Sequence, residues 1–225
     1  MDWSAARVSF WLAAGTVLLL LPVCVWLGRT LAIGRWRGRA LVEAVLMLPL
    51  LLPPTVIGFY FLLVFGGASP VGAWLQRSLD LSLVFTFEGL LLASLIVNLP
   101  FMVQPIQRAF AAIPDSLREA AWVSGLSRWK TLWRIELPLA WPGIVGGVAL
   151  TFAHTLGEFG VVLMVGGSIA GETRTLSIAI YDRVQAFDNA AAGVMSLALV
   201  VLSLVALSIA FATGQRTRRA LQERR

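Results

Sequence analysis

EAAWVSGLSRWKTLWRIELP, residues 119–138, is a polar block in a chain that is otherwise mostly apolar. Of the 225 residues, 58% are hydrophobic and 13% are charged, whereas about 25% of an average soluble domain is charged. A helix that crosses a bilayer needs about 20 mainly apolar residues, and stretches on both sides of the block meet that requirement. The composition therefore predicts an all-α integral membrane protein whose polar block lies outside the membrane.

Five apolar stretches are long enough to cross a bilayer, and we expect one transmembrane domain over residues 1–225. The stretches are residues 8–28, 41–65, 87–110, 139–165 and 190–213. Pro49, Pro53 and Pro54 interrupt the second stretch, so six spans with two shorter helices are the alternative. The first stretch lacks a basic start followed by a small-residue cleavage site, and we expect it to be retained as a span.

The Lys and Arg residues gather in the connections on one side of these spans. Fourteen of the eighteen lie in residues 29–39, in the central block with its approach, or in the tail. Because basic loops stay in the cytoplasm, the central segment 114–136 and the charged tail 214–225 are predicted to be cytoplasmic, with the N-terminus outside. The bases flank apolar spans and form no helix face suited to nucleic acid, so we expect a lipid bilayer and no nucleic acid as partner.

The first half of the block predicts a short helix with a smooth face. Ser116 and Glu119 have the S-x-x-E spacing of a capping box, which predicts a helix start just after residues 114–115. Ala120–Ala121 leaves one face of this helix small, so that another backbone can approach closely. Gly125 then permits the left-handed backbone of a sharp turn.

The second half of the block predicts an amphipathic helix. Ser127 is expected to cap it, and Trp129, Leu132 and Trp133 fall at i, i+3 and i+4 on one apolar face. Pro138 is expected to end this helix and to begin the next span. The residues alone fit either a connector that rests its Trp face on the lipid surface or a knob that another protein's groove holds.

The block resembles the EAA motif of the permease subunits of binding-protein-dependent ABC importers. All fixed positions of EAA-x3-G-x9-I-x-L-P are filled, by Glu119, Ala120, Ala121, Gly125, Ile135, Leu137 and Pro138. The resemblance implies a type I ABC importer permease fold in which this segment is a cytoplasmic coupling helix docked on an ATPase subunit. It also implies a homodimer, two ATPase subunits and an extracytoplasmic oxyanion-binding protein, in the cytoplasmic membrane of a prokaryote.

The chain lacks the residues that an ATPase needs. No G-x-x-x-x-G-K-[ST] loop occurs, and Lys130 is the one lysine in the sequence. We therefore expect no catalytic residues and no cofactor in this chain, with ATP and Mg bound by the partner ATPase. No His/Cys cluster has the spacing of a metal site, and the single Cys24 excludes an internal disulfide.

Two further stretches are similar to the molybdate permease branch of this family. They are LPLLLPPTVIGF (48–59) and TLGEFGVVLMVGGSIAGETRTLSIAIYDRVQ (155–185). The similarity implies molybdate as substrate, with tungstate accepted because the two oxyanions have nearly the same size and charge. Sulfate or thiosulfate is the alternative. From other classes, a stand-alone channel or secondary transporter predicts internal repeats, and an intramembrane enzyme predicts a nucleophile with its base; neither pattern is clear.

Candidate path or gate residues are the breaks and polar groups at membrane depth, where irregular backbone is tolerated if it lines a cavity. They are Pro53, Pro54, Asn98, Pro100, His154, Gly157, Glu158 and Gly160. Because an acid is a poor ligand for an anion, we expect Glu158 to act in structure or gating, including a hydrogen bond across a subunit interface. His154 is expected one turn earlier on the same helical face, where the two side chains could share a proton.

Other residues are predicted to act in packing and at the outer surface. Gly143 and Gly147 have the G-x-x-x-G spacing that favours close helix packing in lipid. Residues that could meet a docked binding protein are Glu172, Arg174, Tyr181, Asp182 and Arg183. No long apolar stretch carries a central base, so we expect a transient, water-lined path and not a tight anion site.

Overall fold

A computed structural model describes residues 2–222, and it describes only the backbone of residues 210, 211 and 213–222. The described chain is helical and contains no strand. Its elements are α1 (Trp3–Ile33), α2 (Arg39–Leu51), α3 (Pro54–Phe65), α4 (Pro70–Leu79), α5 (Phe87–Ala111), α6 (Asp115–Val123), α7 (Arg128–Thr131), the π-helical turn η1 (Leu132–Glu136), α8 (Leu137–Gly157), α9 (Gly160–Gly166), α10 (Leu176–Gln185) and α11 (Asn189–Gln222). Of the predicted tail 214–225, residues 223–225 lie outside the described part.

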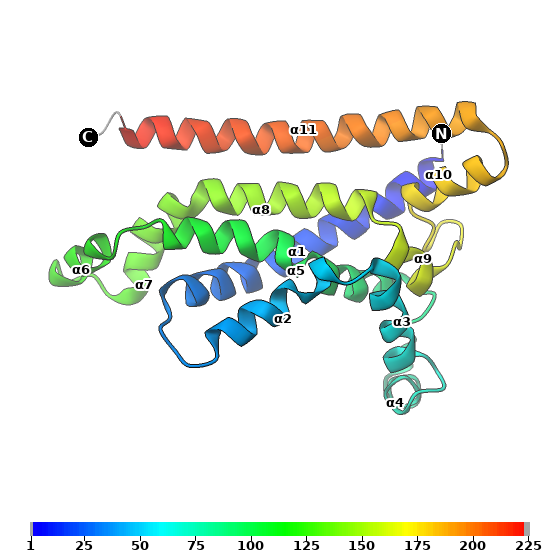
Figure 1. Ribbon diagram of the computed structural model, residues 1–225, viewed down its shortest axis with the longest axis horizontal. Coiled ribbons are helices and arrows are strands. Elements are labelled where there is room, and N and C mark those ends of the chain that lie inside the picture. The colour runs from blue at the N-terminus through cyan, green and yellow to red at the C-terminus, as the bar shows by residue number, and fades with distance from the viewer. Residues whose placement is uncertain (1, 223–225) are drawn as a thin grey trace.

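Helices α1, α5, α8 and α11 run along the long axis of the molecule, with α5 at the centre (Figure 1). Helix α5 packs against α1, α8, α2 and α9, and α11 packs on the outside of α8. Two apolar clusters follow one another along α5, one around Leu90 and Val97 and the other around Met102 and Ile106. The core is therefore built on one central helix.

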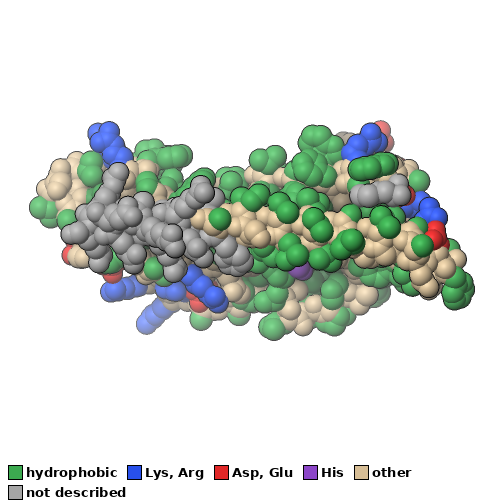
Figure 2. Space-filling model, turned by 90° about the horizontal axis from the view of Figure 1, so that it is seen from above, with side chains coloured by type: hydrophobic (Ala, Val, Ile, Leu, Met, Phe, Trp, Pro, Cys, Tyr) green, Lys and Arg blue, Asp and Glu red, His purple; other side chains and the backbone are tan. Residues whose placement is uncertain are grey.

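Apolar side chains also cover the outside of the bundle. Trp11, Leu18, Leu197 and Leu204 are more than half exposed. Figure 2 shows hydrophobic side chains along the middle of the molecule and Lys, Arg, Asp and Glu side chains near its two ends. This pattern fits a bundle whose middle is covered by lipid, as the composition predicts.

The second predicted span is broken in the structure. Helices α2 and α3 meet at an angle of 108° across Leu52 and Pro53. The break lies at the Pro53–Pro54 pair because proline disfavours a helical conformation of the residue before it; Pro49, in contrast, lies within α2. Four single helices of the described chain are long and apolar enough to cross a membrane, and the bent pair makes five spans if it crosses once.

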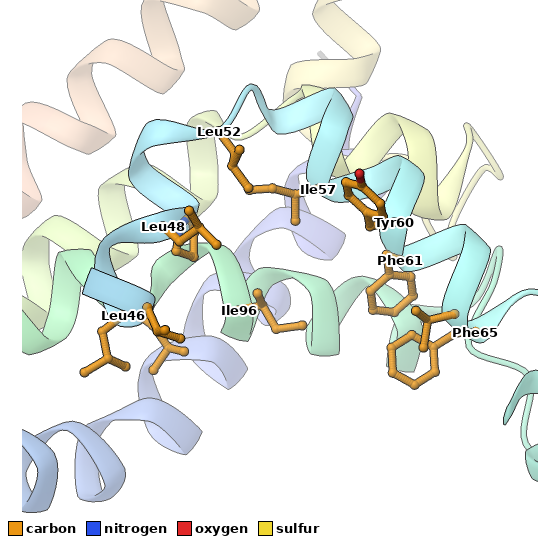
Figure 3. A pocket seen from close by; sticks show the side chains of 12 residues that line it. Leu46, Leu48, Leu52, Ile57, Tyr60, Phe61, Phe65 and Ile96 are labelled. Carbon is orange, nitrogen blue, oxygen red and sulfur yellow. The ribbon is translucent and has the colours of Figure 1, made fainter. Parts of the chain in front are cut away.

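An apolar cavity of about 400 Å³ lies inside the bend (Figure 3). Side chains of α2, α3 and α5 line it, among them Leu48, Phe61 and Ile96. It contains no charged side chain, so it does not resemble a site for an oxyanion.

The polar block forms an elbow at one end of the bundle, which we define as α6, the turn at Gly125, α7 and η1. The N-terminus, α9 and α10 lie at the opposite end, and α11 runs back from α10 toward the elbow end (Figure 1). The end that holds the elbow is thus the one predicted to be cytoplasmic.

Three local predictions for this region and the span after it are wrong. The capping box does not form: α6 begins at Asp115 with Pro114 as N-cap, so Ser116 lies already within the first turn and makes no cap bond. Pro138 does not end a helix, because the wide turn η1 accommodates its ring and the helix is continuous from Arg128 to Gly157. The predicted span 139–165 ends at Gly157, where an extended Glu158 breaks it.

Candidate functional site

The elbow presents most of its motif residues to solvent. Glu119, Ala120 and Gly125 are exposed, whereas Ala121 is buried against the rest of the chain. Gly125 has φ +81°, the left-handed conformation that the sequence predicts, and a Cβ there would meet no atom within 4 Å. Ala120 therefore leaves a small exposed surface on α6, next to a turn that nothing in the described chain covers.

The second arm of the elbow carries exposed aromatic side chains. Ser127 caps α7 by accepting a hydrogen bond from the Lys130 amide at 3.3 Å, as predicted. Trp129 and Trp133 are 68% and 58% exposed, and their rings pack edge to face. The remaining motif residues, Ile135 and Leu137 (half-buried) and Pro138 (exposed), lie where this arm becomes α8.

A buried ion cluster, which no spacing in the sequence reveals, joins the elbow to the bundle. Glu136 is fully buried, and its carboxylate accepts hydrogen bonds from Arg118 Nε at 2.9 Å and from Arg29. Arg118 is also buried and donates to the carbonyl oxygens of Phe110 at 2.8 Å and Ile113 at 3.0 Å. We call Arg29, Arg118 and Glu136 the inner ion cluster; it joins α1, α5, α6 and η1.

Polar side chains of α5 and α8 meet at the break between α8 and α9. Asn98 Oδ1 lies 3.1 Å from Nδ1 of His154, and Asn98 Nδ2 lies 3.5 Å from Oε2 of Glu158. The ring of Phe101 stacks on His154 at a centroid distance of 3.8 Å. We call Asn98, His154 and Glu158 the polar cluster.

Glu158 differs from the prediction in one respect. It does not share a helical face with His154, because α8 ends at Gly157 and Asn98 stands between the two side chains. The Glu158 carboxyl group accepts a hydrogen bond from Asn98 of the same chain, and the hydrogen bond across a subunit interface stays a prediction. Glu158 is 6% exposed, and its Oε1 atom has no hydrogen-bond partner among the described residues.

A cavity of about 330 Å³ lies beside the polar cluster. Its walls come from the bend between α2 and α3 and from the break between α8 and α9, and the two breaks touch: a Cβ on Gly160 would lie 2.9 Å from Cβ of Pro54. Predicted path residues that line this cavity are Pro54, His154, Gly157, Glu158 and Gly160. The structure thus gathers residues from five helices around one space.

The other two proline candidates lie apart from this cavity. Pro53 is the N-cap of α3. Pro100 lines a separate cavity of about 190 Å³, together with Gln104 and Arg108, on the side of the elbow. Arg108 donates to Gln104 Oε1 at 3.3 Å, and its charge makes this second cavity the more favourable one for an anion.

Gly143 and Gly147 lie where α8 crosses α5. A Cβ on Gly143 would lie 2.3 Å from Cβ of Ala109, and one on Gly147 would lie 2.9 Å from the carbonyl oxygen of Met102. Neither distance is available to a real Cβ without a shift of α5. The two glycines therefore allow the close approach of α8 to the central helix.

The residues predicted to meet a docked protein lie at the end opposite the elbow and partly pair with one another. Arg174 lies 3.6 Å from Asp182, and Arg183 lies 3.3 Å from Asp188. Tyr181 is 43% exposed. Glu172 lines a cavity of about 280 Å³ at the outer end of α1.

Comparison with known proteins places this geometry among transport proteins. A family model described as binding-protein-dependent transport system inner membrane component matches residues 22–219. The chain is 44% identical to the molybdenum transport system permease protein ModB of Azotobacter vinelandii, over 92% of this chain and 91% of that protein. It is 34% identical to ModB of Haemophilus influenzae, over 98% of this chain and 97% of that protein.

More distant relatives and solved structures agree in fold. The sulfate transport system permease protein CysT of Escherichia coli is 34% identical over 77% of this chain but 62% of its own length. A bacterial ABC transporter that imports the acidic polysaccharide alginate superposes with a TM-score of 0.76 at 19% identity, over 95% of this chain and 78% of that chain. The methionine ABC transporter MetNI, in an inward-facing form, gives a TM-score of 0.63 at 18% identity, over 97% of this chain and 93% of that chain.

Proposed function

The chain belongs to the family of binding-protein-dependent transport system inner membrane components, and we propose that it is the permease subunit of an ATP-driven importer of molybdate. The assignment of molybdate as substrate rests on one observation: this chain aligns along nearly the whole length of molybdenum permeases, at up to 44% identity. The sulfate permease aligns over a smaller share of both chains. Tungstate, with nearly the same size and charge, is the second oxyanion expected to pass.

ATP hydrolysis takes place in a separate subunit that binds the elbow. In support, the sequence holds no P-loop, and the elbow exposes Glu119, Ala120 and Gly125 at the end of the bundle predicted to be cytoplasmic. Val123, next to them, is 90% exposed although it is apolar, and an apolar side chain so placed is favoured at a protein contact. Two such ATPase subunits, with bound ATP and Mg, serve a homodimer of this chain.

The substrate passes through the cavity beside the polar cluster by alternating access. Irregular backbone at membrane depth is tolerated where it lines a cavity, and both helix breaks of the described chain meet there. The cavity is lined by one acid and by no Lys or Arg, so it does not retain a dianion tightly. Tight selection falls to an extracytoplasmic oxyanion-binding protein that docks at the end opposite the elbow. The C-terminus is cytoplasmic.

Reconstitution into liposomes tests this function. The chain is assembled with the ATPase and the binding protein from the same organism, and uptake of labelled molybdate and sulfate is measured with and without ATP. Uptake of molybdate that needs ATP and exceeds sulfate uptake at least tenfold supports the proposal. Preference for sulfate supports the second candidate, and uptake that needs no ATP rejects the importer in favour of a channel or secondary transporter.

A substitution in the elbow tests the site of ATPase binding. Ala120→Glu places a bulky charge on the smooth face of α6 and is expected to abolish copurification of the ATPase subunit. Ala190→Glu makes the same change at an exposed alanine at the opposite end of the bundle and is the matched control. Equal ATPase copurification with both variants would contradict docking on α6.

A further inference from the structure

We propose that Arg29, Arg118 and Glu136 are positioning residues that couple ATP hydrolysis to transport, by fixing α6 to the inner ends of α1, α5 and α8. The inference rests on the proposed function, since it presumes that an ATPase moves the elbow. It adds that the motion of α6 reaches the spans through one buried ion cluster, and that the exposed motif residues of α6 alone do not transmit it.

Helix α6 has little else with which to hold the bundle. It is nine residues long, and among them only Arg118 and Ala121 are buried. Leu117, Trp122 and Val123 are 43%, 42% and 90% exposed, so apolar packing contributes little to the attachment of α6. A helix that must carry a force into its neighbours therefore depends on the Arg118 side chain.

Arg118 makes a directional attachment at several points. Its guanidinium donates to Glu136 Oε1 at 2.9 Å, to the Phe110 and Ile113 carbonyl oxygens, and to Asp115 Oδ1 at 2.9 Å. Phe110 and Ile113 belong to the end of α5 and the turn after it. Because the guanidinium is planar and its donors have fixed directions, α6 cannot rotate against the end of α5 without breaking these bonds.

Glu136 extends the attachment to two further elements. It is the last residue of η1, directly before α8, and it also accepts hydrogen bonds from Arg29 of α1. The π-helical turn directs Glu136 inward while Arg134, two residues earlier, is exposed. A π-helical turn in an otherwise α-helical segment is frequent at functional sites, and here it brings Glu136, the one fully buried carboxylate among the residues whose side chains are described, between two guanidinium groups.

The choice of charged residues points to geometry as the role of the cluster. Removing charges from water is so unfavourable that a well-packed apolar pair often stabilises a protein as much as a buried ion pair does. What an apolar pair does not supply is a fixed orientation. An ion cluster that joins four elements at the root of a docking elbow is therefore suited to holding one angle between the elbow and the spans.

Neutralising Glu136 tests the inference in the assembled transporter. In Glu136→Gln, two facing guanidinium groups lose their shared anion, and α6 is expected to move independently of the spans. We expect ATPase copurification at the wild-type level, ATP hydrolysis within about twofold of wild type, and at least a tenfold fall in molybdate transported per ATP hydrolysed. Arg118→Lys keeps the charge but not the planar fork, and an intermediate ratio is expected.

Controls and a second variant separate coupling from stability. Glu88→Gln removes an exposed carboxylate at the far end of α5, and Arg37→Gln removes an exposed base beside the elbow; both should keep the wild-type transport per ATP. If transport and hydrolysis fall together, in proportion to the amount of folded complex, the cluster is merely structural and the inference is overturned. Should Glu136→Gln fail to assemble, Arg29→Gln, at the partly exposed edge of the cluster, must show the lowered ratio.

A measurement on the chain alone distinguishes failure of this inference from failure of the proposed function. Spin labels at Trp26 of α1 and at Ser124, directly after α6, in a Cys24→Ala background, report the position of the elbow relative to the bundle without any ATPase. We expect a narrow distance distribution with Glu136 and a broad one with Glu136→Gln. Equal distributions would overturn the positioning role, even if ATP-driven uptake of molybdate were established.

Discussion

Arg118 and Glu136 form a buried ion pair across the whole elbow, with Nε and Oε1 2.9 Å apart although the two residues are 18 positions apart in the chain. The turn at Gly125 lies between them in the chain and is exposed to solvent. The two arms of an otherwise exposed segment are thus closed at their base by a contact that excludes water.

Loss of Arg118 should destabilise the chain much more than loss of a neighbouring exposed base. Arg118→Met leaves Glu136 buried beside a single remaining base, and breaking a buried pair in this way costs about 3–5 kcal/mol. Arg134→Met removes an exposed base of the same block and should cost at most about 1 kcal/mol. Thermal unfolding of the detergent-solubilised chain measures the difference, and equal midpoints for the two variants would contradict the burial of the pair.

Gly125→Ala should weaken ATPase binding through the backbone of the turn. The substitution meets no atom within 4 Å, but at φ +81° a side chain costs about 1–2 kcal/mol. Gly171→Ala is the matched control, because Gly171 has φ +82° and equally free surroundings but lies outside the elbow. Both variants should lose similar stability, and only Gly125→Ala should lower ATPase copurification. A similar loss of copurification in both would show that the effect is not local to the elbow.

Neighbouring glycines of α8 should respond oppositely to alanine. Gly143→Ala forces a methyl group against Ala109 and should destabilise the chain by about 1–3 kcal/mol. Gly146→Ala meets nothing within 4 Å and should stabilise it by up to about 1 kcal/mol through helix propensity. Thermal midpoints of the two variants in the same detergent give the comparison. A destabilised Gly146→Ala would contradict the described packing of α8.

Glu158→Gln should raise leakage of substrate through the path. The Glu158 side chain lines the cavity, and glutamine adds an amide N–H that donates to an oxyanion while it keeps a carbonyl oxygen that accepts from Asn98. Efflux of labelled molybdate from loaded liposomes without ATP is expected to rise several-fold in the variant and to stay unchanged in Glu88→Gln. If Glu158→Gln instead lowers the affinity of ATP-driven uptake with no change in leakage, Glu158 contacts the substrate.

Asp2 should contribute a pH-dependent part of the stability at the outer end of α1. Hydrogen bonds from the Ser4 hydroxyl and the Ala5 amide, with Arg174 nearby, hold the pKa of Asp2 below its ordinary value of 3.8. The stabilisation is therefore complete above pH 3.8 and is lost as the pH falls through the lowered pKa of the folded state. Asp2→Ala should cost about 1 kcal/mol at pH 7 and progressively less in acid. A difference in thermal midpoint between the two chains that does not depend on pH would contradict this.

The spans could be predicted because a helix that crosses the hydrocarbon core needs about 20 mainly apolar residues, and such stretches are visible in the sequence. Residues 8–28 and 87–110 lie within α1 and α5, and the start of 190–213 falls one residue after that of α11. The fourth span was extended too far, to residue 165, because hydropathy does not register the break at Glu158 between two glycines. Residues 176–185 form α10, which no apolar stretch of the sequence predicts. This helix is short, and it is held by tertiary contacts that no local pattern encodes.

The candidate sites likewise divide into features that local sequence patterns predict and features that depend on tertiary packing. The turn at Gly125 and the cap at Ser127 follow from local backbone rules, and the structure has both. The polar cluster was foreseen as separate polar groups at membrane depth, but the position of Asn98 between His154 and Glu158 depends on how α5 and α8 cross. The inner ion cluster was not predicted because Arg29 and Glu136 are 107 residues apart in the chain. Arg29 and Arg118 entered the sequence argument only as two of the bases whose distribution predicts the cytoplasmic side.

Helix Arg128–Gly157 is unbroken from the elbow to the break beside the cavity, and its 30 residues correspond to about 45 Å. If the proposed ATPase subunit moved the exposed tryptophans, the movement would therefore reach the opposite end of the same helix without an intervening hinge. There it would swing Gly157 and Glu158 relative to Pro54, which bounds the same space from the other side. A movement of the ATPase subunit would in this way change the width of the cavity beside Pro54.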